Sequence, residues 1–224
     1  MKRAACAVLA LMLTAGSAAA ADDAKLTTDN QRFSYALGLD FGTYLKKLGY
    51  NFDMATVEQA IKDGYTPDAK LLMTQQEAEQ AQKDLFQAML AERKEAAKKF
   101  LEENKTKEGV KTTESGLQYK IIKEGKGDKP TVRDTVKVQY KGTLLDGTEF
   151  DSSYSRNEPA RFQVKQVIPG WIEGLQLMTP GSVFELYVPP ELGYGDQGAP
   201  PVIPPGSLLK FKVELLEVIK SEEE

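Results

Sequence analysis

The longest uninterrupted helical pattern, which contains no glycine or proline, constrains the architecture of this chain more than any other feature. It runs from Thr74 to Glu108, and Thr74 with Glu77 predicts a capping box at its start. A helix of about 35 residues, at 1.5 Å per residue, is a rod on the order of 50 Å long. Its second half, residues 92–107, is rich in charge, which is typical of a solvated face. We therefore predict a stalk between two domains.

Two shorter helices are predicted before the stalk. Thr28, with Gln31 as the other half of a capping box, caps the first, which runs toward Leu48. Asp53 caps the second, which ends at Gly64. The first helix has a very wide apolar face, formed by Phe33, Tyr35, Ala36, Leu37, Leu39, Phe41, Tyr44, Leu45 and Leu48. Two short helices and a rod cannot cover this face, so we predict a homodimer through residues 22–73. The alternative is packing on the C-terminal half of the same chain, which a charged stalk disfavours.

The first 21 residues predict a cleaved secretory signal. Lys2 and Arg3 precede an apolar run and a small-residue stretch with Ala-x-Ala sites. The apolar run is too short to span a bilayer, and no later stretch approaches the roughly 20 apolar residues that a stable span needs. The only cysteine, Cys6, lies inside the signal, so we expect an exported chain without disulfides. The periplasm is the expected destination, with outer-membrane association or secretion as alternatives.

The absence of histidine excludes several kinds of active site. It removes histidine general bases, Ser-His and Cys-His nucleophile pairs, and histidine metal ligands. We therefore predict no metal and no cofactor. Without Lys2 and Arg3 the chain has 27 basic and 33 acidic residues, so its net charge changes from −4 to −6. A mildly acidic, mixed surface gives no indication of nucleic-acid binding.

After Thr112 the sequence periodicity changes from helical to strand-like, and glycine and proline become frequent. Strands are predicted at residues 116–122, 135–144, 149–152, 161–164, 182–188 and 208–218. A short helix at residues 171–176 has to cover one face of the sheet. The fold class is therefore α+β: an all-α domain (22–73), a long connecting helix (74–112), and a curled antiparallel sheet wrapped on a short helix (113–224).

The only tryptophan, Trp171, opens the short predicted helix, directly after a Pro-Gly pair. A tryptophan in this position can form the floor of a pocket, although taken alone it is more often ordinary core. The pocket is favoured because further aromatic residues fall near the inner or terminal positions of predicted strands and loops: Tyr140, Phe150, Phe162, Tyr194 and Phe211. Glu149, Asp151 and Glu173 could suggest glycosidase-type carboxylate pairs, but the aromatic slot explains them better.

Five motifs, in order over about a hundred residues, resemble the FK506-binding (FKBP) family of peptidyl-prolyl cis-trans isomerases. They begin at Tyr140 (YKGTL), Gly147 (GTEFDSS), Val167 (VIPGWIEGL), Leu192 (LGYG) and Ile203 (IPPGSLLKF). With the signal and the helical half, nearly the whole exported chain resembles the secreted Mip/FkpA-type members, which are dimers.

The resemblance implies roles for individual residues. Trp171 would form the pocket floor, and the lining would comprise Tyr140, Phe150, Phe162, Val167, Ile168, Tyr194, Val202, Ile203 and Phe211. The Ile168 backbone N–H and the Tyr194 hydroxyl would bind substrate carbonyls, while Asp151, beside Phe150, would face the twisting bond. The implied partners are proline-containing unfolded polypeptides and macrolides such as FK506 and rapamycin. Val164 and Ala199 depart from the family pattern, in which an aromatic residue and a histidine are frequent.

This chemistry suits a chain without histidine. An Xaa-Pro bond rotates over a barrier of about 18–20 kcal/mol, and no nucleophile is needed to lower that barrier. An apolar slot can remove water from the amide, while a few polar groups favour the twisted state. The alternative function is a dimeric, non-enzymatic chaperone that holds unfolded clients between its two arms. The two functions differ in the part of the chain that they need. Isomerase activity should survive in a Thr113–Glu224 fragment, whereas client holding should need the helical half.

Overall fold

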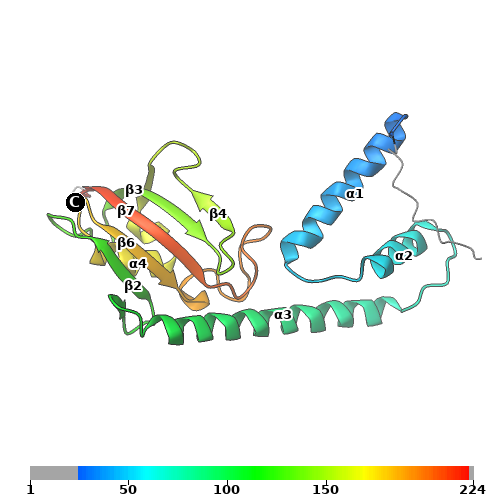
Figure 1. Cartoon of the computed structure of the whole chain (residues 1–224), viewed down its shortest axis with the longest axis horizontal. Coiled ribbons are helices and arrows are strands. Elements are labelled where there is room, and N and C mark those ends of the chain that lie inside the picture. The colour runs from blue at the N-terminus through cyan, green and yellow to red at the C-terminus, as the bar shows by residue number, and fades with distance from the viewer. Residues whose placement is uncertain (1–24, 222–224) are drawn as a thin grey trace, which may run out of the picture. The chain divides into compact units, whose positions relative to one another are not determined.

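The computed structural model describes residues 25–221 (Figure 1). The predicted signal, including Cys6, lies outside the described residues. The chain divides between Tyr44 and Leu45 into two compact units, which are described separately. Among the described residues, no helix is long and apolar enough to cross a membrane.

The first unit holds most of helix α1 (Asp29–Leu48). The predicted capping box is present, since the backbone N–H of Gln31 donates to Thr28 Oγ1 at 3.2 Å and the Thr28 N–H donates to Gln31 Oε1 at 3.1 Å. Six large apolar side chains of α1 in this unit are at least 41% exposed: Phe33, Tyr35, Leu37, Leu39, Phe41 and Tyr44. Together they make a broad apolar surface on this helix.

The second unit contains helices α2 (Met54–Tyr65) and α3 (Gln75–Asn104). Asp53 caps α2 through the Thr56 N–H at 3.1 Å, and the predicted capping box of Thr74 and Glu77 opens α3. The predicted end of the long helix at Glu108 is wrong by four residues. The chain leaves the helix at Asn104, whose buried side chain donates to Gln118 Oε1 at 3.0 Å, so the rod is about 45 Å long.

One seven-stranded antiparallel sheet forms the rest of this unit. Its strands are β1 (Val110–Thr112), β2 (Gln118–Lys123), β3 (Thr135–Thr143), β4 (Glu149–Ser152), β5 (Ala160–Gln163), β6 (Val183–Val188) and β7 (Leu209–Ile219). Their order is β1-β2-β6-β7-β3-β4, and β5 pairs with β3. Short 3-10 helices, η1 (Val164–Gln166) and η2 (Pro190–Leu192), and helix α4 (Pro169–Leu177) complete the unit. The predicted α+β fold is thus confirmed.

Two details of the sheet differ from the prediction. The first strand, β1, lies in the range predicted as connecting helix, and its three residues pair with β2. Val164 was predicted to end a strand, but it begins η1 instead. Its side chain is fully buried in the core, and its backbone N–H donates to the Asp134 carbonyl oxygen at 3.0 Å.

Helix α4 lies close against the sheet because two glycines face strand β6 (Figure 1). A Cβ on Gly170 would lie 2.6 Å from Val188 Cγ1, and a Cβ on Gly174 would lie 2.8 Å from Leu186 Cδ1. Trp171 follows the first of these glycines and is 3% exposed in the core between α4 and the sheet. The missing side chains of these two glycines therefore allow α4, and with it Trp171, to lie close to β6.

Candidate active site

Four aromatic rings meet around Trp171. Three of them contact its ring nearly edge-on: Tyr140 at 5.2 Å between centroids, Phe211 at 5.2 Å and Phe162 at 5.6 Å. Phe150 contacts Phe211 at 5.4 Å, so Trp171 and four of the five aromatic residues predicted around it form one cluster. The predicted Tyr194 is not among these contacts. Such edge-to-face arrangements are a preferred geometry of aromatic pairs.

The indole Nε1 of Trp171 is fully buried and makes no hydrogen bond within residues 25–221. Buried polar groups are nearly always paired, and an unpaired donor costs on the order of 1–3 kcal/mol. This departure from ordinary core packing coincides with the aromatic cluster, and both indicate a functional role for the tryptophan.

A polar network borders the aromatic cluster. The Tyr140 hydroxyl donates to Asp151 Oδ2, and Arg156 Nη1 donates to Asp151 Oδ1. Arg156 Nη2 also donates to the Tyr140 hydroxyl oxygen at 2.9 Å, which closes a three-residue ring of hydrogen bonds. Strand β4 supplies Asp151, strand β3 supplies Tyr140, and the turn after β4 supplies Arg156. Both carboxylate oxygens are therefore held in place.

This network keeps Asp151 ionised. Burial by itself would raise the pKa of Asp151, but the hydrogen bonds from Tyr140 and Arg156 outweigh burial and lower it. Burial, and then the hydrogen bond to Asp151, raises the pKa of Tyr140 to about 12. At neutral pH the site consequently holds a fixed carboxylate, a neutral phenol and a guanidinium.

The two predicted carbonyl-binding groups are free within the described chain. Ile168 is the N-cap of α4, and its backbone N–H donates to no acceptor in residues 25–221. The Tyr194 ring is 42% exposed, and its hydroxyl has no hydrogen bond within the same residues. Both groups are thus able to receive a ligand.

The remaining predicted residues fall in two environments. Val167 and Ile168 pack against the core cluster, and Ile203 is buried within it at 4% exposure. Val202 is 48% exposed on the loop between η2 and β7. Ala199 and Ile203 exchange backbone hydrogen bonds of 2.8 and 3.0 Å, so this loop is internally braced.

The residue that sequence reasoning missed is Arg156. It lies in an exposed turn, and only its distance of five residues from Asp151 could have suggested a contact. Residues 25–221 contain no group of three or more side chains able to hold a metal ion.

Helix α3 contacts the loop that carries Tyr194 and Ile203. Lys94 Nζ lies 2.5 Å from Asp196 Oδ1. A Cβ on Gly206, which is buried at φ +70°, would lie 2.6 Å from Leu90 Cδ1. The middle of the stalk therefore supports one side of the candidate site.

Comparison with known proteins agrees with this geometry. Residues 126–216 match the model of the FKBP-type peptidyl-prolyl cis-trans isomerase, and residues 30–121 match the domain amino terminal to that isomerase. The chain is 40% identical to the outer membrane protein MIP of Legionella longbeachae, with 99% of each chain covered. It is 41% identical to the peptidyl-prolyl cis-trans isomerase Mip of Coxiella burnetii, covering 87% of this chain and 89% of the relative.

A solved structure is similar over most of its length. The crystal structure of FkpA from Escherichia coli aligns with a TM-score of 0.60 at 39% identity, covering 86% of this chain and 98% of FkpA. The aromatic cluster, the fold and these relatives lead to one assignment: the chain belongs to the FKBP-type peptidyl-prolyl cis-trans isomerase family and is an enzyme of that type.

Proposed function

We propose that this isomerase acts without covalent chemistry, through the aromatic cluster around Trp171. The observation that carries the proposal is the set of perpendicular rings about a buried, unpaired indole. A proline ring is apolar and fits between such faces, and its binding there removes water from the preceding amide. The planar amide loses stabilisation in this environment, whereas the twisted amide is less dependent on resonance and on water.

The polar groups act on the two sides of the twisting bond. The Ile168 N–H and the Tyr194 hydroxyl donate to substrate carbonyls, which fixes the chain on either side of the proline. Asp151 supplies a constant negative charge near the bond, held by Tyr140 and Arg156. Each tenfold acceleration needs about 1.4 kcal/mol of preferential binding of the twisted state. Phe150, Val167, Val202 and Ile203 shape the walls of the slot.

The proposed substrates are unfolded or partly folded exported polypeptides that contain proline. Macrolides such as FK506 and rapamycin are proposed to occupy the same slot, since they present an apolar ring and carbonyl groups. The reaction requires no cofactor or metal in this proposal. The relative named outer membrane protein MIP supports export of this chain, and we place it in the periplasm or at the outer membrane.

The test is the cis-trans exchange rate of a short Leu-Pro peptide, measured by NMR exchange without a protease. Wild type should accelerate the exchange, and FK506 should suppress it. Asp151→Leu should lower the rate at least tenfold, because it removes the charge and releases Tyr140 and Arg156. Asp128→Leu, the same change on an exposed loop of the same domain, serves as the control. A full rate in Asp151→Leu with an intact fold would remove Asp151 from the mechanism.

A second function, holding of unfolded clients by a dimer, is favoured by the exposed apolar surface of α1. We propose that two copies of the chain associate through this surface and α2, and that part of the surface binds clients. Suppression of aggregation of a denatured client should then persist in Asp151→Leu. If aggregation is suppressed only by variants that retain isomerase activity, the holding function is contradicted.

A further inference from the structure

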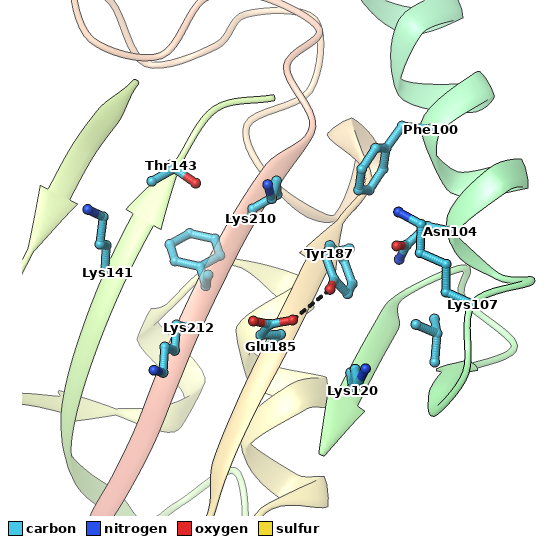
Figure 2. Close-up of a pocket in the computed structure, with 12 residues that line it drawn as sticks. Phe100, Asn104, Lys107, Lys120, Lys141, Thr143, Glu185, Tyr187, Lys210 and Lys212 are labelled. Carbon is cyan, nitrogen blue, oxygen red and sulfur yellow. Dashed lines mark hydrogen bonds between the residues drawn. The ribbon is translucent and has the colours of Figure 1, made fainter. Parts of the chain in front are cut away.

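A basic cavity lies on the face of the sheet opposite to the aromatic cluster. It has a volume of about 350 Å³ and lies between the C-terminal end of α3 and the outer face of the sheet. Side chains alternate along β7, so Lys210 and Lys212 face outward. Phe211, whose ring packs in the aromatic cluster, also lines this cavity. Figure 2 shows Phe100 and Asn104 from α3, with Lys107 from the turn that follows it, on one side of this cavity and Lys141 and Thr143 on the other.

The charge of the cavity contrasts with that of the protein. Five lysines line it, against a single carboxylate: Lys107, Lys120, Lys141, Lys210 and Lys212, with Glu185. The whole chain, in contrast, has a net charge of −4. Glu185 carries one negative charge, so it can neutralise only one of the five cations. Its carboxylate also accepts a hydrogen bond from the Tyr187 hydroxyl at 2.8 Å.

Strand register places the charges in a row. Lys120 on β2 lies opposite Glu185 on β6, Glu185 lies opposite Lys212 on β7, and Lys212 lies opposite Lys141 on β3. Like charges directly opposite each other destabilise a sheet. Within residues 25–221, only Lys141 of these three lysines has an ion pair, with Glu149 at 2.9 Å. The row therefore keeps a net positive charge.

The dimensions of the row fit an extended polypeptide. Adjacent strands lie about 4.8 Å apart, so three spacings from Lys120 to Lys141 are about 14 Å. In an extended chain, side chains at positions i and i+4 are about 13 Å apart on one face, with i+2 between them. Carboxylates at positions i and i+4 therefore match Lys120 and Lys141, the two ends of the row.

The walls disfavour a small, multiply charged ion. The cavity contains no arginine, whose planar fork is the usual bidentate phosphate ligand. Phe100 and Tyr187 pack at 5.7 Å between centroids and offer an apolar wall. These features favour a peptide that carries acidic and aromatic side chains.

We propose that this cavity is a second binding site for acidic, extended segments of the polypeptides that the isomerase serves. The proposal rests on the proposed function only for the origin of the peptide, namely the client itself. Such a site holds a client outside the aromatic slot, and it gives acidic clients a higher affinity than a short peptide has.

The test measures binding of a proline-free probe, so its outcome is independent of isomerisation. A fluorescein-labelled Gly-Glu-Phe-Glu-Gly-Glu peptide is titrated with the full chain, and anisotropy is recorded. Lys120→Gln/Lys212→Gln should weaken binding threefold to tenfold, while Lys120→Arg/Lys212→Arg should retain it. Binding should decrease between about 10 mM and about 1 M salt, where the Debye length falls from about 30 Å to about 3 Å.

The control variant is Lys126→Gln/Lys129→Gln, which removes the same charge from an exposed loop of the same domain. It should bind the peptide as wild type does, and a peptide with Gln in place of Glu should bind weakly to all variants. Exchange of the short Leu-Pro peptide should be unchanged in Lys120→Gln/Lys212→Gln. The proposal is overturned if Lys120→Gln/Lys212→Gln binds the peptide as tightly as wild type does, or if Lys126→Gln/Lys129→Gln loses as much binding as Lys120→Gln/Lys212→Gln. It is also overturned, in favour of a membrane surface, if Lys120→Gln/Lys212→Gln loses binding to phosphatidylglycerol vesicles but not to the peptide.

Discussion

Asp151 illustrates how a carboxylate can serve an active site without exchanging a proton. Both of its oxygens accept hydrogen bonds, from Tyr140 and Arg156, and these bonds lower its pKa despite burial. The Tyr140 pKa is raised to about 12, and the chain has no histidine. No group of this network therefore changes its charge near neutral pH.

The first prediction follows from these charges. The kcat/KM for a short neutral Leu-Pro peptide should be constant from about pH 5 to about pH 9, because the network titrates outside that interval. Activity should fall only at acid pH, where Asp151 becomes protonated; because its pKa is lowered, this happens at a lower pH than for an ordinary aspartate. NMR exchange across this interval checks the expectation, with the uncatalysed rate as the control. A bell-shaped profile centred near pH 7 would contradict it.

The second prediction concerns Asp134, which is buried where the last strand ends. Its carboxylate accepts hydrogen bonds from the Thr131 N–H at 2.7 Å, the Ser221 N–H at 3.1 Å and Lys220 Nζ at 3.2 Å. Burial opposes ionisation, but these bonds outweigh it and lower the pKa of Asp134 from 3.8 to about 2. Asp134→Asn should therefore reduce the free energy of unfolding at pH 7 by about 2 kcal/mol.

The sign of the pH effect follows from the lowered pKa. The stabilisation by Asp134 is complete above about pH 4 and is lost as the pH falls through about 2. Urea unfolding of wild type and Asp134→Asn should therefore converge at acid pH. Asp128→Asn, on an exposed loop, should leave the unfolding free energy within about 0.5 kcal/mol of wild type. A constant difference between wild type and Asp134→Asn at all pH values would exclude this linkage.

At the level of single residues, the sequence predicted side chains with a strong chemical signal. Of the five aromatic residues predicted around Trp171, the fold brings four together as expected: Tyr140, Phe150, Phe162 and Phe211. The fifth, Tyr194, is 42% exposed on a loop. Arg156 could not be predicted, because a charged residue in an exposed turn looks like any other solvated side chain. Its contact with Asp151 depends on how the turn after β4 folds back. The functional roles of all the candidate site residues, Asp151 and Trp171 included, stay predictions.

Among the elements, α3 combines two structural roles. Its C-terminal end is fixed to the sheet by Asn104, which bonds Gln118, while Gln118 Nε2 donates to Leu101 O at 2.8 Å. Its middle contacts the loop of the candidate site through Leu90 and Lys94. The stalk is therefore a structural support of the catalytic domain as well as a connection.

The third prediction tests this support. Leu90→Ala/Lys94→Gln should lower kcat/KM for the short peptide threefold to tenfold, which is about 1 kcal/mol of lost transition-state stabilisation. The loop with Tyr194 and Ile203 loses its apolar contact and its ion pair, so these residues are held less firmly. NMR exchange provides the rate, and FK506 affinity should weaken in parallel. Glu92→Ala/Lys98→Gln, at exposed positions of the same helix, should have no effect. Unchanged kinetics in the first variant would show that the loop holds its shape unaided.

Element boundaries show where sequence reasoning ends. Capping boxes at Thr28 and Thr74 and the apolar periodicity located every helix start in the helical half. The end of α3 and the strand β1 were missed, because both depend on a tertiary contact. Asn104 leaves the helix to bond Gln118, and the three residues of β1 pair only with β2. Neither contact has a local sequence pattern.

At the scale of the whole molecule, the apolar surface of α1 is the proposed interface between copies of the chain. Phe33, Leu37, Phe41 and Tyr44 lie along one side of the helix, while Tyr35 and Leu39 lie on the other. A helix that is apolar on both sides needs to be enclosed. One partner helix cannot do this, so we expect an interface in which α1 and α2 of two chains surround one another.

The fourth prediction is that Leu37→Ser/Phe41→Ser converts the dimer to a monomer. Each substitution removes roughly 2 kcal/mol of buried apolar side chain from each subunit, so four such losses accumulate in the assembly. Sedimentation velocity measures the change, and exchange of the short peptide should be retained. Thr43→Ser/Lys46→Ser, on the same helix, should stay dimeric. A dimer that survives the first substitutions would place the interface elsewhere.

The structure also changes the choice of fragment for separating the two functions. A fragment that begins at Thr113 lacks β1, Asn104 and the contacts of Leu90 and Lys94. One that begins at Thr74 keeps the capping box of α3 and every contact between this helix and the sheet domain. The longer fragment is the appropriate monomeric reference for isomerase activity.

The position of Trp171 has a practical consequence. It is the only tryptophan in the chain, and it lies in the candidate site at 3% exposure, with aromatic rings on several sides. Its fluorescence is therefore a spectroscopic signal from the site alone, free of background from other indoles. A ligand that enters the slot changes the polarity around this fluorophore. Emission wavelength and intensity can then report occupancy in real time, in the unlabelled protein.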